Sequence, residues 1–331
     1  MSSPHAGKRR TLAAAVVLLT PPLFVLLPVI LVLMAVVDLA IGARRLPRAR
    51  FLGMAAHYLA LEWAGVVAAI GLWFATGFGR ENERPWSQAA HHHVQLWWAN
   101  SIARAANTWL GLRFDTSAVE VDTEKPLVIL SQHASILDAI IPTLLLTDSS
   151  DLGPARHVLK RELALDPCLG TYGSRLRNHF VSRAGGDDAE LACIEALAAT
   201  ADREPLVIFP EGTFHSPARA LRAYSRLATT APERVRDGPL GNLLPVRPGG
   251  FTALLRGRPE SSLVFVAHVG MESFGSLRAI AENIPFTEPV VIRTWQTPAN
   301  DVPATAEEQL TLVDERWRAM DAWITEARPN R

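Results

Sequence analysis

The chain contains the segment Leu127-Val128-Ile129-Leu130-Ser131-Gln132-His133-Ala134-Ser135-Ile136-Leu137-Asp138, in which four apolar residues lead directly into a polar turn. A short apolar run of this kind predicts a buried strand. In open α/β sheets, sites form where the strands reach their carboxyl ends. His133 and Asp138 are therefore candidates for a base and the carboxylate that orients it.

A second apolar segment, residues 206–209, ends in the turn Pro210-Glu211-Gly212-Thr213. We expect this turn to complete a pocket beside His133. The histidine is a weak signal by itself, because His57 and His157 also have an acidic residue five positions later. His133 is the one that follows an uninterrupted apolar segment, where a parallel strand is expected to end.

Strands and helices alternate along the rest of the chain, which predicts an α/β domain with a largely parallel central sheet flanked by helices. An amphipathic helix is expected first, at Trp86–Leu110. Strands are then expected at Val119–Val121, Leu127–Leu130, Leu206–Phe209, Leu263–His268 and Val290–Trp295, and helices at Ile136–Leu146, Asp187–Ala201, Phe251–Leu255 and Leu310–Ile324.

The N-terminal region is apolar and predicts membrane helices. Thr11–Ile41 carries Asp38 as its one charge, and a helix needs about 20 apolar residues to cross a bilayer. Trp63–Gly79 is a second, shorter apolar segment, and Pro21-Pro22 is expected to break the first near its start. Basic residues flank the first segment on both sides, so the positive-inside rule does not choose an orientation. A hairpin in one leaflet or a pair of packed helices is favoured over two separate spans.

The expected division is a membrane segment at residues 1–85 and a catalytic domain at residues 86–331.

Composition excludes several classes of protein. Lys and Arg together number 33, as do Asp and Glu, so the formal net charge is zero. The sequence has no basic stripe with interleaved aromatic residues, and a nucleic-acid-binding protein is therefore not indicated. Two scattered cysteines, Cys168 and Cys193, suit a reducing compartment, so the catalytic domain is expected on the cytoplasmic face of the membrane. Neighbouring residues on a helix point about 100° apart, so His91-His92-His93 does not predict a metal site. There is no Gly-x-Ser-x-Gly elbow of a serine hydrolase, and the apolar segments are too few for a transporter.

The two opening motifs are followed by further blocks in a characteristic order. With these blocks the chain resembles the lysophospholipid acyltransferase family, whose type member acylates 1-acylglycerol-3-phosphate, and the resemblance covers roughly residues 86–325. The further blocks are Lys160–Leu163, Pro167, Gly170, Gly173, Asn178–Arg183, Leu243–Phe251 and Ile284–Phe286.

The resemblance implies a membrane-bound O-acyltransferase that moves a fatty acyl chain from acyl-CoA or acyl carrier protein to the hydroxyl of a lysophospholipid. The donor is a substrate, and no cofactor or metal is implied. His133 would act as general base and Asp138 would orient it, since histidine has a suitable pKa for this role. The backbone of Gly212 and Thr213 would meet the oxyanion of the tetrahedral intermediate.

The remaining site residues follow from the same resemblance. Glu211 would hold the glycerol of the acceptor or brace the turn. Arg183 and Lys160 would bind the anionic headgroup, since arginine matches phosphate in geometry.

One departure from the family pattern concerns the headgroup. Phe214 stands where the family usually has an arginine that contacts phosphate, and the nearest candidates to replace it are Arg219, Arg222 and Arg247. The acceptor could therefore carry a larger or less charged headgroup than a phosphate monoester.

Two further hypotheses for the function of the chain are a CoA-independent transacylase and a non-catalytic membrane-binding protein of the same fold.

Overall fold

The computed structural model describes residues 6–134, 138, 141–146, 152–181, 188–236, 238–271, 274 and 277–328. The chain forms two compact units. The first comprises residues 1–113, 159–183 and 276–289, and the second comprises residues 114–158, 184–275 and 290–331. The helix predicted at Trp86–Leu110 belongs to the first unit, and the domain boundary at residues 85 and 86 stays a prediction.

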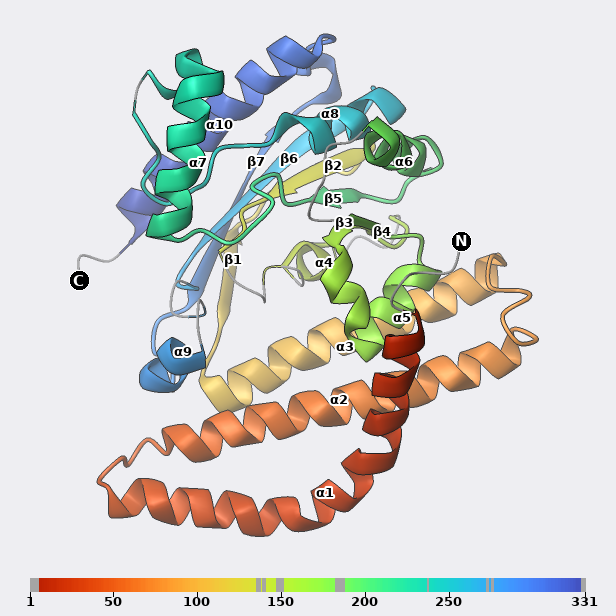
Figure 1. Cartoon of the computed structure of the whole chain (residues 1–331), viewed down its shortest axis with the longest axis vertical. Coiled ribbons are helices and arrows are strands. Elements are labelled where there is room, and N and C mark those ends of the chain that lie inside the picture. The colour runs from red at the N-terminus through yellow and green to blue at the C-terminus, as the bar shows by residue number, and fades with distance from the viewer. Residues whose placement is uncertain are drawn as a thin grey trace. The chain divides into compact units, whose positions relative to one another are not determined.

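The first unit is built on three long helices, α1 (Ala6–Ala40), α2 (Pro47–Ala75) and α3 (Pro85–Leu110), in which α2 packs against both of the others. Pro21 and Pro22 do not end the first helix as expected. The helix runs through them and through Pro28, and Figure 1 shows α1 bending along its length. Both α1 and α2 are long and apolar enough to cross a membrane, by length and composition. The smaller elements of this unit are η2 (Arg161–Leu165), α5 (Pro167–Arg175), β4 (His179–Val181) and α9 (Leu277–Asn283).

A largely parallel sheet, as predicted, forms the centre of the second unit. The strand order is β1-β7-β6-β2-β5-β3, and β3 continues at Leu159 into the first unit, where β4 follows in the order. Among the strand pairs described, β6 with β7 is antiparallel and the others are parallel. The strands are β1 (Phe114–Ala118), β2 (Leu127–Ser131), β3 (Arg156–Lys160), β5 (Leu206–Ile208), β6 (Ser262–Val269) and β7 (Val290–Thr297).

Helices cover this sheet, and its strands β2, β5 and β6 are buried along their whole length. α8 (Pro248–Gly257) packs on β2 and β5, α10 (Ala306–Ala327) packs on β6, and α6 (Asp188–Ala199) packs on α8. The helix predicted at Leu310–Ile324 is confirmed within α10, and its apolar residues Val313, Trp317, Met320 and Ile324 are buried. Each such side chain contributes about 1.5–3 kcal/mol when fully buried. The remaining elements are α4 (Ile141–Leu145), α7 (Pro217–Thr230), η3 (Pro232–Val235) and η5 (Ala299–Asp301).

The first strand differs from its prediction. β1 ends at Ala118, before the predicted strand at Val119–Val121. Beyond β1 the chain still follows β7, but through side chains: the backbone N–H of Glu120 donates to Thr294 Oγ1, and that of Asp122 donates to Gln296 Oε1. The helix predicted at Ile136–Leu146 lies partly outside the described residues, and α4 covers its second half.

Candidate active site

Three neighbouring parallel strands, β5, β2 and β6, bring the two motifs together. His133 lies two residues after the end of β2, and Glu211 lies three residues after the end of β5. Parallel strands end at the same edge of a sheet, so residues far apart in sequence meet there. The backbone N–H of His133 donates to Glu211 Oε1 at 2.7 Å, which joins the two motifs directly.

His133 and Asp138 form the expected pair. His133 Nδ1 lies 3.3 Å from Asp138 Oδ2, and the Asp138 side chain is fully buried while the His133 side chain is 12% exposed. The same Oδ2 accepts a hydrogen bond from the Ala134 backbone N–H at 2.5 Å. A carboxylate that accepts from Nδ1–H leaves the Nε2 lone pair available, which is the tautomer that a general base needs.

Glu211 is a brace in this geometry, one of its two predicted roles. Its side chain is buried, and its two oxygens accept from the backbone N–H groups of His133 (2.7 Å) and Leu244 (2.8 Å). Burial raises the pKa of Glu211 to about 8, although both hydrogen bonds oppose the shift. Glu211 thus holds the ends of two loops, and a direct contact with substrate stays a prediction.

Gly212 and Thr213 differ in what their amides can offer. Gly212 has φ +69°, in the left-handed region that favours glycine, and its N–H already donates to Phe209 O at 3.0 Å. Within the described part of the chain, no acceptor is found for the N–H of Thr213. Of the two amides predicted to bind an oxyanion, that of Thr213 is the one with a free hydrogen.

Phe214 packs against the candidate base. Its ring centroid lies 4.2 Å from that of His133, and the Phe209 ring lies 4.8 Å from the same imidazole. The position at which the family carries a phosphate-binding arginine is therefore an apolar neighbour of the base. Two aromatic rings restrict the orientation of His133 and shield it from water.

Arg247 lies beside the Glu-Gly-Thr turn. Its backbone N–H donates to Pro210 O at 2.9 Å, and a Cβ placed on Gly212 would lie 3.1 Å from the guanidinium carbon. The side chain is exposed, and no carboxylate of the described residues pairs with it. Arg219 Nη1 donates to Phe214 O at 3.2 Å, and Arg222 is exposed on α7.

Two further cations, Lys160 and Arg183, were predicted to bind the headgroup. Lys160 is the last residue of β3, and Arg183 lies outside the described residues. Their role at the headgroup stays a prediction.

His268, near the end of β6, was missed by the sequence reasoning. Its Nε2 lies 3.2 Å from Asp138 Oδ1, and its side chain is 1% exposed. Half of the signal that singled out His133 applies to it: His268 follows the apolar run Leu263–Ala267, but the residue five positions later is Ser273 and not an acid.

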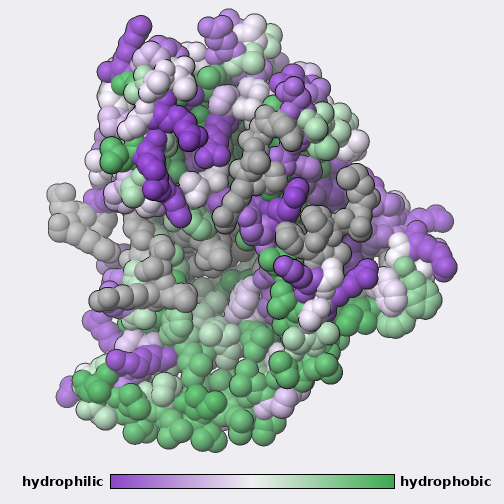
Figure 2. Space-filling model, viewed as in Figure 1, coloured by the Kyte–Doolittle hydropathy of each residue, from purple (hydrophilic) through white to green (hydrophobic). Residues whose placement is uncertain are grey.

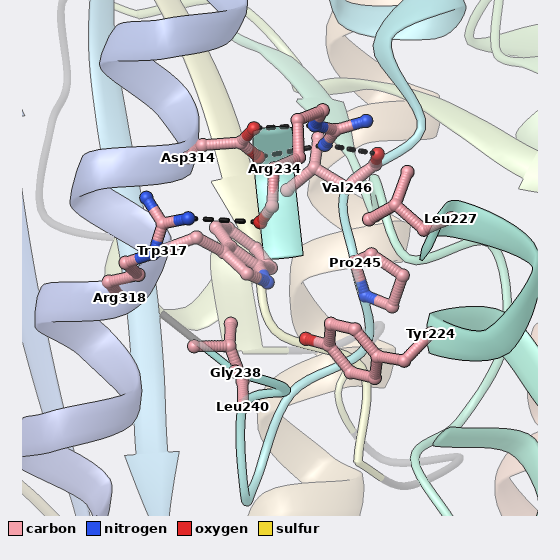
Figure 3. A pocket seen from close by; sticks show the side chains of 10 residues that line it. All are labelled: Tyr224, Leu227, Arg234, Gly238, Leu240, Pro245, Val246, Asp314, Trp317 and Arg318. Atoms are coloured by element: carbon pink, nitrogen blue, oxygen red, sulfur yellow. Dashed lines mark hydrogen bonds and ion pairs between the residues drawn. The ribbon is translucent and has the colours of Figure 1, made fainter. Parts of the chain in front are cut away.

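A small pocket lies elsewhere in the second unit (Figure 3), and none of its lining residues belongs to the two motifs. The Arg234–Asp314 ion pair spans it, with N–O distances of 2.6 and 2.8 Å. Its wall includes Pro245 and Val246, which follow the Leu244 amide bound by Glu211. Among the residues described, no three His, Cys, Asp or Glu side chains are grouped to hold a metal ion.

Residues 113–257 match the family model described as Acyltransferase, a segment that runs from β1 to α8 and contains both motifs. This segment is an acyltransferase domain. The match confirms the family resemblance and the expectation that the chain is an acyltransferase enzyme.

Among solved structures, the chain is similar to the 1-acyl-sn-glycerophosphate (LPA) acyltransferase PlsC from Thermotoga maritima, with 15% sequence identity and a TM-score of 0.47. That similarity covers 84% of this acyltransferase and 100% of the other chain. No curated protein matches the chain.

Proposed function

We propose that this acyltransferase transfers a fatty acyl chain from acyl-CoA or acyl carrier protein to the free hydroxyl of a lysophospholipid, with 1-acylglycerol-3-phosphate as the leading acceptor. The observation that carries the proposal is the His133–Asp138 pair at the sheet edge, held beside the Glu-Gly-Thr turn by Glu211. The product with this acceptor is phosphatidic acid.

The chemistry requires one base and one donor to the oxyanion. His133 Nε2 takes the proton of the acceptor hydroxyl as the oxygen attacks the thioester carbonyl, and Asp138 stabilises the imidazolium. The Thr213 N–H is the proposed donor to the tetrahedral oxyanion. As the intermediate collapses, the C–S bond breaks and the imidazolium returns its proton to the leaving thiolate. The thioester is already activated, so no covalent enzyme intermediate is required.

Arg247 supports a phosphate-bearing acceptor despite Phe214. The exposed Arg247 guanidinium lies beside Gly212 and pairs with no carboxylate of the described residues, so it offers an anion the forked geometry that suits phosphate. The aromatic ring of Phe214 on the base favours, in contrast, a lysophospholipid with a larger or less charged headgroup. Lys160 and Arg183 remain further proposed headgroup contacts.

The proposed location is a membrane, because acceptor and product are both lipids. The exposed apolar side chains of α1, such as Leu18 (71% exposed) and Val25 (77% exposed), fit a lipid environment. In Figure 2, hydrophobic residues gather on the surface over α1 and α2. We propose that the catalytic domain faces the cytoplasm.

The base is tested with membranes from cells that express the chain, supplied with labelled acyl-CoA and lysophosphatidate. His133→Ala should lose at least about 100-fold in the rate of diacyl product formation, as expected for removal of a general base. His93→Ala, at an exposed position on α3, is the matched control and should keep the rate. Undiminished turnover by His133→Ala would reject the assignment. Product formed equally well without added thioester would show a CoA-independent transacylase.

The headgroup is tested by a panel of lysophospholipids that differ in charge and size. If Arg247 binds phosphate, Arg247→Gln should raise KM for lysophosphatidate about tenfold, with little change in KM for the thioester. Arg226→Gln, an exposed arginine on α7, is the charge-matched control. A wild-type preference for a zwitterionic acceptor, insensitive to Arg247→Gln, would support an acceptor with a larger headgroup.

A further inference from the structure

His268 is fixed to the backbone that leads into the first motif. The Gln132 N–H donates to Val266 O at 2.9 Å, and the His268 N–H donates to Gln132 Oε1 at 2.9 Å. These two hydrogen bonds extend the pairing of β2 with β6 beyond its last residue pair, Ser131 and Val266. This link sets the position of His268 relative to His133, the residue after Gln132.

The Asp138 carboxylate lies between two imidazoles. Oδ2 faces His133 Nδ1 at 3.3 Å and the Ala134 N–H at 2.5 Å, while Oδ1 lies 3.2 Å from His268 Nε2. The side chains of Asp138 and His268 are 0% and 1% exposed. A buried carboxylate needs partners for both oxygens, and His268 supplies one for the oxygen that His133 does not use.

The position of the Asp138 carboxylate favours one tautomer of His268. A lone pair on Nε2 would repel Oδ1 at this distance, so the proton belongs on Nε2. The contact is electrostatic in character, because the ring is not aligned for a hydrogen bond. The other ring nitrogen, Nδ1, is buried and has no hydrogen-bond partner among the described residues.

We propose that His268 is a positioning residue for acyl transfer: it holds Asp138 Oδ1, so that Oδ2 stays on His133 Nδ1 while the base works. The inference rests on the proposed function of His133. His268 does not touch substrate. Without it, the carboxylate loses one restraint on rotation about its Cβ–Cγ bond, so Oδ2 is held less firmly on His133 Nδ1 even though the Ala134 N–H still binds that oxygen.

Three substitutions separate this role from simple packing. Gln can place an amide N–H close to the position of Nε2, whereas the shorter Asn cannot reach it and Leu offers no donor. We expect His268→Leu and His268→Asn to lower kcat roughly 10- to 100-fold with KM nearly unchanged, a part of the full contribution of a general base. His268→Gln should restore kcat to within about threefold of wild type by the same criterion.

Thermal unfolding in the same detergent distinguishes positioning from stability. The inference is overturned if kcat falls in proportion to a lower Tm in all three variants, or if His268→Gln is as impaired as His268→Leu. It is also overturned if His268→Leu keeps wild-type kcat.

A second measurement does not depend on activity. The ¹⁵N chemical shifts of the His133 ring, assigned by loss of the signal in His133→Ala, report which nitrogen holds the proton. We expect the Nδ1–H tautomer in the wild type and in His268→Gln, and a mixture of tautomers in His268→Leu. The same shifts in all proteins would contradict the inference. A tautomer change in a protein that transfers no acyl group would reject the proposed function and leave the role of His268 intact.

Discussion

At the scale of single residues, the site is organised by buried carboxylates that bind backbone as well as side chains. Glu211 accepts from the amides of His133 and Leu244, and Asp138 accepts from the Ala134 amide while it faces two imidazoles. Each of these two side chains therefore holds the backbone of a loop and, at the same time, the position of the candidate base His133. Removing one leaves buried donors unsatisfied, at about 1–3 kcal/mol for each.

The raised pKa of Glu211 makes stability depend on pH. The ordinary value is 4.5 and the value in the folded protein is about 8, so between these limits the folded protein binds this proton more tightly than the unfolded chain does. The free energy of unfolding should therefore fall as pH rises through this range, by at most about 1.4 kcal/mol per pH unit from this group.

Urea unfolding followed by tryptophan fluorescence between pH 5 and about 8 checks this dependence. Glu211→Gln should flatten the slope, because glutamine does not titrate, and should also lower stability, because its amide cannot accept from both N–H groups. Glu315→Gln, at an exposed position on α10, is the control. Equal slopes in the two variants would contradict the assignment.

At the scale of elements, Asp38 joins the two apolar helices of the first unit. The residue before α2, Leu46, has φ +53° and provides no side-chain cap. Asp38, near the end of α1, takes that place: it is fully buried and accepts from the backbone N–H groups of Arg48 and Ala49, each at 3.0 Å, and from the Arg48 side chain. The one charge in the apolar segment is thus a helix cap from a neighbouring helix.

Loss of this cap should loosen the connection between α1 and α2. Asp38→Ala removes both acceptors and should destabilise the start of α2 by about 1 kcal/mol. Trypsin should then cut after Arg45 and Arg48 several-fold faster in detergent micelles, as mass spectrometry of the fragments would show. Asp38→Asn keeps one acceptor oxygen and should give an intermediate rate. Cleavage at the wild-type rate in Asp38→Ala would reject the capping role.

At the scale of the whole molecule, charge and hydropathy indicate different modes of membrane binding. The formal net charge is zero, although residues 1–50 carry a basic excess, while the exposed surface of α1 is apolar over most of its length. Apolar burial does not weaken at high salt, whereas attraction between exposed charges does, because the Debye length falls to about 3 Å at 1 M.

We therefore expect washes of the membrane fraction with about 1 M salt to leave the acyltransferase bound and detergent to release it. Immunoblots of supernatant and pellet make the measurement. Release by salt alone would show that the basic residues near the N-terminus, and not α1, hold the protein at the membrane.

Much of the fold was predictable from sequence because the information is local. Unbroken apolar runs predicted β2, β5 and β6, and the spacing of apolar residues predicted α10. The strands that the sequence did not predict are short or rich in polar residues. β3, for example, contains Arg156, His157 and Lys160 among its five residues. Arg156 is nevertheless buried, because Glu204 and the backbone at Leu197 and Thr200 satisfy its guanidinium. Such compensation comes from distant residues and leaves no local signal.

The amino-acid sequence by itself determined the α/β class, the order of the motifs and the choice of His133 among the three histidines with an acidic residue at the fifth position. Tertiary structure alone showed that Glu211 binds backbone on both sides, that Phe214 packs on the base, and that His268 reaches Asp138. The physical reason is the order of the strands. Neighbouring parallel strands come from distant parts of the chain, so the contacts between their ends depend on which strands pair, and no local pattern records that pairing.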